Sequence, residues 1–178
     1  MSVAFYTPAR MTGKNIFGEK FFVAEDFKDQ VYSQLGKNTH QIKIITNTAR
    51  ARRFQIKRFQ DFNRYFPCWY RMQLLVPGVD KDFSYVGCNV SSKGTLYGRT
   101  YRAISGFTGN QRPSESHAYE RVHPIIEELG VKYEDLHFTV QHCRIPSNLK
   151  DYGVTLEEIE DCLISHSKAM GYNLVNRS

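Results

Sequence analysis

The sequence predicts a single α+β domain over residues 1–178, with an antiparallel-dominated sheet of about five strands and about four helices. Its 178 residues are close to the usual length of one domain, and 41% of them are hydrophobic and 24% charged, as in ordinary globular proteins. Segments with the alternation typical of strands are interleaved with segments of helical spacing. No internal repeat or low-complexity tract is visible, which argues against repeat architectures.

The first part of the chain is expected to contain an irregular arm, a helix, a strand and a second helix. The arm, residues 1–20, has no clear hydrophobic period. The first helix covers about 25–35, because apolar residues recur there at every fourth position. Residues 41–46 alternate as a short strand. In the second helix, about 49–66, aromatic residues gather on one face and basic residues on the other, and Pro67 disfavours its continuation.

After Pro67 the pattern changes to strands joined by tight turns and then returns to helices. Apolar residues alternate in three consecutive segments, which favours an antiparallel meander. Pro124 interrupts a later helical pattern and predicts a kink or two short helices. Thr155 and Glu158 have the spacing of a capping box before the last helix. The expected elements are strands over 68–76, 83–90 and 95–104, a polar loop over 106–113, a helix up to residue 129, a strand over 136–145 and a helix over 156–170, with all helices on one face of the sheet.

Composition indicates an intracellular protein. No stretch approaches the roughly 18 consecutive apolar residues that a membrane-spanning helix needs, and the N-terminus lacks the pattern of a secretory signal. We therefore expect a cytoplasmic protein with no membrane contact, no cofactor and no bound metal. Reduced thiols are expected as well, because no two of the cysteines form a CxxC pair. The cysteines are Cys68, Cys88, Cys143 and Cys162.

The formal net charge of +6 is distributed unevenly along the chain. Residues 1–110 hold 17 Lys and Arg against 7 Asp and Glu, whereas residues 111–178 hold 7 against 11. Within residues 50–71, seven basic residues stand against one acidic residue, Asp61. Such a concentrated positive field attracts nucleic acid, an anionic membrane or an acidic protein.

The expected second helix places basic side chains in a row on its outer face. Guanidinium groups bind phosphates in a bidentate way, and binding releases counterions from the polyanion. The alternatives are a solvated helix face or a surface for an acidic protein partner, but the lack of interleaved acids favours a polyanion. The predicted nucleic-acid-binding residues are Arg50, Arg52, Arg53, Lys57, Arg64 and Arg71.

Three tyrosines on the expected neighbouring strands are candidates for stacking against bases. Tyr85, Tyr97 and Tyr101 would supply the aromatic platforms that single-strand binders use. The alternative is that they are half-buried strand aromatics, which agrees with the β-propensity of tyrosine.

One strand carries a candidate catalytic pair. His137, Thr139 and Gln141 alternate on one face, so an imidazole and a hydroxyl are expected side by side. A His-x-Thr unit on a strand resembles half of the signature of the two-histidine phosphoesterases, which use two such units to cleave a phosphodiester. The nearest second unit is His40-Gln41-Ile42, in which isoleucine replaces the hydroxyl residue. The alternative is a hydrogen-bonded structural histidine.

A second resemblance involves two glycine-containing segments. Tyr85-Val86-Gly87 and Leu96-Tyr97-Gly98-Arg99 resemble the hairpin of the GIY-YIG nucleases, in which two strand tyrosines, an arginine and a glutamate surround a metal-activated water. That resemblance implies catalytic roles for Tyr85, Tyr97 and Glu120. The second segment lacks the residue that the family has between Tyr and Gly, and a glycine-containing hairpin explains the same residues.

The sequence leaves three hypotheses for function. The leading one is a small basic protein that binds the phosphate backbone of DNA or RNA through its basic helix and has no chemistry of its own. The second is a phosphodiesterase or nuclease in which the basic surface positions a phosphodiester near the candidate catalytic residues. The third is a structural protein whose basic and acidic parts associate in an oligomer. No P-loop, GxGxxG, HExxH or GxSxG motif occurs.

Overall fold

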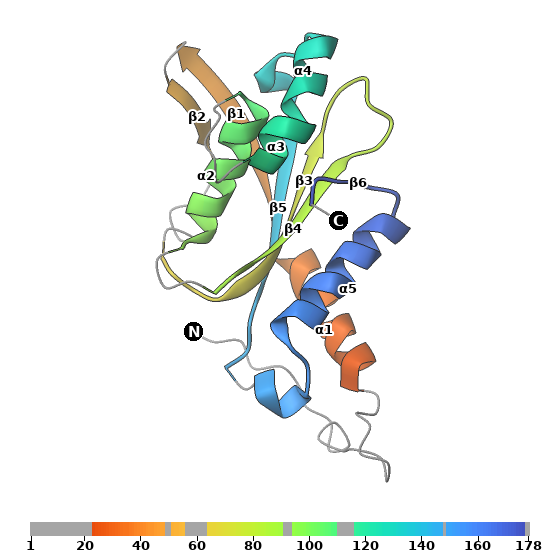
Figure 1. Cartoon of the computed structure of the whole chain (residues 1–178). Helices are drawn as coiled ribbons and strands as arrows, with labels where there is room; N and C mark the ends of the chain where they lie inside the picture. The colour runs from red at the N-terminus through yellow and green to blue at the C-terminus, as the bar shows by residue number, and fades with distance from the viewer. Residues whose placement is uncertain are drawn as a thin grey trace.

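One sheet with helices on both of its faces makes up the described part of the chain (Figure 1). The computed structural model describes residues 23–48, 51–55, 64–90, 94–109, 116–147 and 149–176. The strands are β1 (Thr39–Thr48), β2 (Ala51–Gln55), β3 (Cys68–Leu75), β4 (Phe83–Asn89), β5 (His137–Arg144) and β6 (Asn173–Leu174). The helices are α1 (Val23–Lys37), α2 (Leu96–Phe107), α3 (Ser116–Arg121), α4 (His123–Leu129) and α5 (Leu156–Ala169), with the short 3₁₀ turns η3 (Tyr133–Asp135) and η4 (Leu149–Tyr152).

The strand order is β2-β1-β5-β3-β4-β6. All neighbouring strands are antiparallel except β4 and β6, which are parallel. The predicted α+β class with an antiparallel-dominated sheet is therefore confirmed. The short β6 was not expected from the sequence, because its two residues carry no alternation of their own.

Elements with strong local signals lie where the sequence predicts them. The first helix and the strands β1, β3, β4 and β5 match the expected ranges within a few residues. The pattern around Pro124 is resolved into two short helices, α3 and α4, with this proline in the first turn of α4. The capping box of α5 is present, since Thr155 accepts a hydrogen bond from the backbone of Glu158 and the Glu158 carboxylate accepts one from the backbone of Thr155.

The predicted helix over 49–66 is wrong in the part that the structure describes. Residues 51–55 form β2, which pairs with β1 as an antiparallel hairpin, and residues 64–67 are not helical. The aromatic spacing that fits a helix does not decide the structure here, because β1 offers a row of backbone hydrogen-bonding groups that a strand can satisfy. Helix formation would leave that edge of β1 unpaired.

The predicted strand over 95–104 is also wrong, because these residues lie at the start of α2. Thr95 is the N-cap of this helix, and its hydroxyl accepts a hydrogen bond from the backbone of Gly98. Along the helix Leu96, Thr100 and Ile104 are buried at every fourth position. Since α2 extends to residue 107, the expected polar loop over 106–113 does not begin at 106, and its residues 110–113 lie outside the described part of the chain, as does the expected arm.

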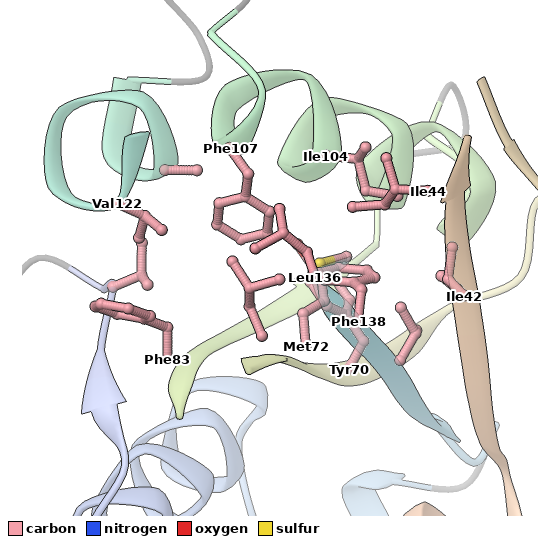
Figure 2. Packing of buried hydrophobic residues seen from close by; sticks show 14 of the residues in the cluster. Ile42, Ile44, Tyr70, Met72, Phe83, Ile104, Phe107, Val122, Leu136 and Phe138 are labelled. Atoms are coloured by element: carbon pink, nitrogen blue, oxygen red, sulfur yellow. The ribbon is translucent and has the colours of Figure 1, made fainter. Parts of the chain in front are cut away.

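The first helical layer consists of α2, α3 and α4 and packs on one face of the sheet. Figure 2 shows Ile104 and Phe107 of α2 above the strand residues Tyr70, Met72 and Phe138. The rings of Phe107 and Phe138 meet at a centroid distance of 5.6 Å and an interplanar angle of 62°. This layer covers the side chains of every second residue along β3 and β5. We call the buried residues between this layer and the sheet the first core.

The second helical layer consists of α1 and α5 and packs on the opposite face, which corrects the expectation that all helices share one face (Figure 1). Its centre is Trp69, which is fully buried and meets the ring of Phe27 edge to face at 6.0 Å. The indole of Trp69 donates a hydrogen bond to the carbonyl of Leu156 at the start of α5. Both faces of β3 are therefore buried around residues 69 and 70, and a second layer is needed to cover them.

Candidate functional site

A polar surface lies on the face of the sheet that carries α1 and α5. Its side chains alternate along their strands with residues of the first core. They therefore lie on the same face of the sheet as Trp69 and Cys143, which pack under α1 and α5. None of them is acidic. We call this surface the polar sheet face and define it by Thr39, Gln41 and Lys43 of β1, Arg71 and Gln73 of β3, and His137, Thr139 and Gln141 of β5.

The strand register places these side chains in rows across three strands. Arg71 is opposite Gln141, which is in turn opposite Thr39. The next row joins Gln73, Thr139 and Gln41, and Lys43 is opposite His137 beyond it. The prediction that His137, Thr139 and Gln141 share one face of their strand is therefore confirmed.

The face is covered at one end and open at the other. Arg71 is only 6% exposed, whereas Gln41, Lys43 and His137 are exposed. In Figure 1 the α1 and α5 layer covers the lower part of the sheet, and β1 extends beyond it. The cationic and hydrogen-bonding groups thus run from a buried arginine to a solvent-exposed lysine.

Arg71 is fixed by neutral hydrogen-bonding partners. Its Nε donates to Oε1 of Gln141 at 2.9 Å, and its Nη1 lies 2.9 Å from Nδ1 of His166 on α5. Because a guanidinium group only donates, Nδ1 of His166 is the acceptor, and the imidazole is neutral with its proton on Nε2. The amide of Gln141 donates in turn to the hydroxyl of Thr39, which donates to the carbonyl of Leu35.

Electrostatics agree with this geometry. Burial lowers the pKa of Arg71, and the nearby Tyr172 and Tyr32 act in the opposite direction. The pKa of His166 is lowered by burial and then by Arg71, which favours the neutral imidazole. The ring of Tyr32 stacks on His166 at a centroid distance of 4.4 Å. Within the described residues no carboxylate lies within salt-bridge distance of Arg71.

The predicted cationic ridge of a single helix is wrong. Arg52 and Arg53 occupy successive positions of β2, and successive positions of a strand belong to opposite faces of a sheet. Arg64 is exposed in a non-helical segment, and Arg71 is buried on β3. Arg50 and Lys57 lie outside the described residues. Arg71 is the member of this group that lies in a described side-chain network, and its partners come from β5 and α5.

The proposed stacking platform and the GIY-YIG hairpin are not formed. Tyr85 is on β4 and packs against the first core, whereas Tyr97 and Tyr101 lie on α2. The second segment of the hairpin is helical, because residues 96–99 are the first turn of α2. Glu120 is exposed on α3 and is not on the polar sheet face.

The two-histidine arrangement is not formed either. His40 is paired with Val140, so it belongs to the face opposite His137 and Thr139. The two imidazoles therefore do not share a cleft. Nor do any three His, Cys, Asp or Glu side chains of the described segments come together in a way that would hold a metal ion.

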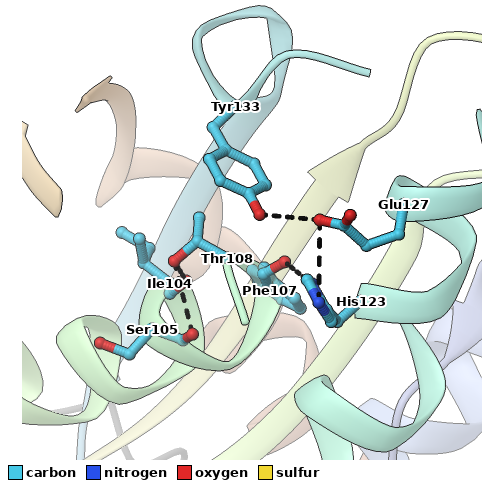
Figure 3. A network of polar contacts seen from close by, with 7 residues as sticks. All are labelled: Ile104, Ser105, Phe107, Thr108, His123, Glu127 and Tyr133. Carbon is cyan, nitrogen blue, oxygen red and sulfur yellow. Dashed lines mark hydrogen bonds and ion pairs between the residues drawn. The ribbon is translucent and has the colours of Figure 1, made fainter. Parts of the chain in front are cut away.

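A second polar network joins the helices of the first layer, and no sequence pattern predicted it. Figure 3 shows His123 of α4 between Phe107 and Glu127. Its Nδ1 is 3.1 Å from the carbonyl oxygen of Phe107, and its Nε2 is 3.8 Å from Oε1 of Glu127, which also accepts a hydrogen bond from Tyr133. The carbonyl of Phe107 is at the C-terminus of α2, where backbone carbonyls have no N–H donor within the helix. The network therefore has a structural role as a cap.

Comparisons with known proteins add no further assignment. The chain matches no protein-family model, no curated protein and no solved structure. Nor does any helix among the described residues have the length and apolar character needed to cross a bilayer.

Proposed function

We propose that this protein binds nucleic acid, and that the polar sheet face contacts the phosphate backbone. The observation that supports this proposal most is the combination of Lys43, His137 and Arg71 with uncharged hydrogen-bonding residues on the polar sheet face, none of whose defining residues is acidic. A surface evolved only for solubility usually mixes both signs of charge. The leading hypothesis from the sequence is thereby kept, with its binding surface moved from a helix to the sheet.

The chemistry of the open end suits a polyanion. Lys43 and His137 are opposite each other and exposed, so both are accessible to a chain of phosphates. Gln41, Gln73 and Thr139 add neutral donors and acceptors that contact phosphate or sugar without selecting a sequence. The excess of basic residues in positions 1–110 supplies a long-range attraction toward the same ligand.

The test is a salt series with labelled single-stranded DNA and RNA oligonucleotides. The logarithm of the affinity should fall linearly with the logarithm of the salt concentration. Lys43→Gln should weaken binding and reduce the slope by roughly 0.7–0.9, the value for one phosphate contact. The matched control is Lys132→Gln, because this exposed lysine is flanked by Val131 and Tyr133, which pack on the other face of the sheet.

Two results would contradict the proposal. One is the absence of binding at low salt, and the other is an equal effect of the Lys43 and Lys132 substitutions. The same samples are scored for degradation of the oligonucleotide. Degradation that disappears in His137→Ala would instead favour the phosphodiesterase hypothesis, since His137 and Thr139 are adjacent on one strand face.

A further inference from the structure

We infer that Arg71 is a binding site for one phosphate group at the covered end of the polar sheet face. The inference goes further than backbone binding, because it assigns a particular residue and a particular anion.

A buried arginine normally has an anionic partner. Removing a charge from water is costly, and buried charges are usually paired for this reason. Arg71 is 6% exposed, yet both of its hydrogen-bond partners in the structure, Gln141 and His166, are neutral. No carboxylate in the described segments approaches it. The positive charge is therefore left for a ligand to neutralise.

The geometry leaves suitable donors on the guanidinium group. Nε is used by Gln141, and one N–H of Nη1 is directed to His166. The remaining N–H groups, on Nη1 and Nη2, lie in the plane of the fork that binds phosphate in a bidentate way. The group is also preorganised, since Gln141 is fixed by Thr39 and the ring of His166 is stacked on Tyr32.

The position of Arg71 selects the form of the phosphate. The side chain is nearly buried between the sheet and α5, whereas Gln41, Lys43 and His137 at the other end of the polar sheet face are exposed. A phosphate inside a nucleic-acid chain carries a sugar on each side and needs an open approach, whereas inorganic phosphate or a terminal phosphomonoester is smaller. We therefore expect Arg71 to bind free phosphate or the phosphorylated end of a strand, the latter resting on the proposed function.

The first arm of the experiment uses inorganic phosphate and thermal unfolding. Phosphate should raise the unfolding temperature of the wild type above its value in sodium chloride of equal ionic strength, because a ligand that binds only the folded state stabilises it. In Arg71→Met, which keeps a similar volume without the charge, this phosphate-specific rise should disappear. Lys132→Gln is the matched control and should keep it, because this exposed lysine is flanked by Val131 and Tyr133, which pack on the other face of the sheet.

A second variant covers the case in which Arg71→Met does not fold. Arg71→Lys keeps the charge but removes the bidentate fork, and the phosphate-specific rise should become smaller than in the wild type. The inference is overturned if phosphate and chloride give the same unfolding temperature in the wild type, or if an Arg71 variant responds to phosphate as strongly as the wild type.

The second arm separates the two sources of phosphate. An oligonucleotide with a 5′- or 3′-phosphate should bind roughly tenfold more tightly than the same oligonucleotide without it, as expected for a charge-assisted bidentate contact, and Arg71→Lys should reduce the ratio. If no oligonucleotide binds but inorganic phosphate still stabilises the protein, the proposed function fails and the phosphate site stands. If oligonucleotides bind but neither the phosphate-specific rise nor the preference for a phosphorylated end depends on Arg71, the phosphate site fails and the proposed function stands.

Discussion

At the scale of single residues, Tyr70 of one strand restricts which residue can stand at position 87 of the neighbouring strand. Tyr70 and Gly87 are opposite each other on β3 and β4, and the phenol ring of Tyr70 lies over the backbone of Gly87. A Cβ at position 87 would be 2.3 Å from Oη and 2.4 Å from Cζ of Tyr70. The glycine is therefore needed for close approach, in the manner by which aromatic side chains cover glycines in sheets.

Replacement of Gly87 by alanine should destabilise the protein by about 1–3 kcal/mol, the usual cost of overpacking a core. Tyr70 is 3% exposed and belongs to the first core, so a movement of its ring would disturb that core. The free energy of unfolding in urea is the measurement.

Gly36 provides the matched control for this prediction. It is near the end of α1, and a Cβ added there would meet nothing within 4 Å. Gly36→Ala should therefore be neutral or stabilise by about 0.5–1 kcal/mol, because alanine favours a helix over glycine. Equal stability of Gly87→Ala and the wild type would show that Tyr70 is free to move away.

At the scale of elements, the C-terminal segment after α5 completes the edge of the sheet. Asn173 donates a backbone hydrogen bond to the carbonyl of Asp82, just before β4, and Val175 donates one to the carbonyl of Ser84 in β4. Where the backbone pairing ends, the side chain of Asn176 continues it, accepting from the backbone N–H of Val86 and donating to its carbonyl. The segment therefore covers an edge that would otherwise present unpaired groups.

Replacement of Asn176 by alanine should cost about 1–3 kcal/mol of stability, because it leaves the buried backbone groups of Val86 without partners. Asn173→Ala is the control, since its side chain makes one exposed hydrogen bond, to the carbonyl of Lys81. Urea unfolding and amide exchange at Val86 measure the two effects. An Asn176 variant no less stable than the Asn173 variant would contradict this role of the side chain.

At the scale of the whole molecule, a pair of stacked histidines, one buried and one partly buried, links folding to pH. His142 is 5% exposed and stacks on His40 at a centroid distance of 5.5 Å, with the ring of Phe66 also in contact. Burial, then His40 and Arg144, lower the pKa of His142 to about 4. Burial also lowers the pKa of His40. Folding therefore favours the neutral imidazoles.

This linkage predicts that acid destabilises the protein. The contribution of His142 is complete above pH 6.5, the pKa of an unperturbed histidine, and is lost as the pH falls from there to about 4. The full loss is on the order of 3 kcal/mol. His142→Gln cannot gain a proton, so its free energy of unfolding should fall less steeply than that of the wild type between pH 7 and 5. Parallel profiles for the two proteins would contradict the assignment.

The extent to which the sequence predicts this fold depends on how local each signal is. Three predictions are correct because each depends on residues within a few positions of one another. They are the helix α1, the division into two helices at Pro124, and the capping box of Thr155 and Glu158. The segments over 49–66 and 95–104 have ambiguous spacing. Pairing with β1 decides the structure of residues 51–55, and packing on the sheet decides that of residues 96–104.

The same distinction applies to the candidate site. The alternation of His137, Thr139 and Gln141 could be predicted because all three belong to one strand. Arg71 could be singled out because it belongs to the basic segment 50–71. The partners of Arg71 could not be found in this way, since Gln141 and His166 are 70 and 95 positions away in the chain.

The sequence by itself determined the α+β class, most element positions and the excess of positive charge in the first 110 residues, because these follow from local periodicity and from composition. Only the tertiary structure decided that helices cover both faces, that residues 51–55 form a strand in place of the predicted basic helix, and that Arg71 is buried among neutral partners. The physical reason is that burial and the pairing of a charge depend on contacts between strands and helices far apart in the chain, which no local pattern encodes.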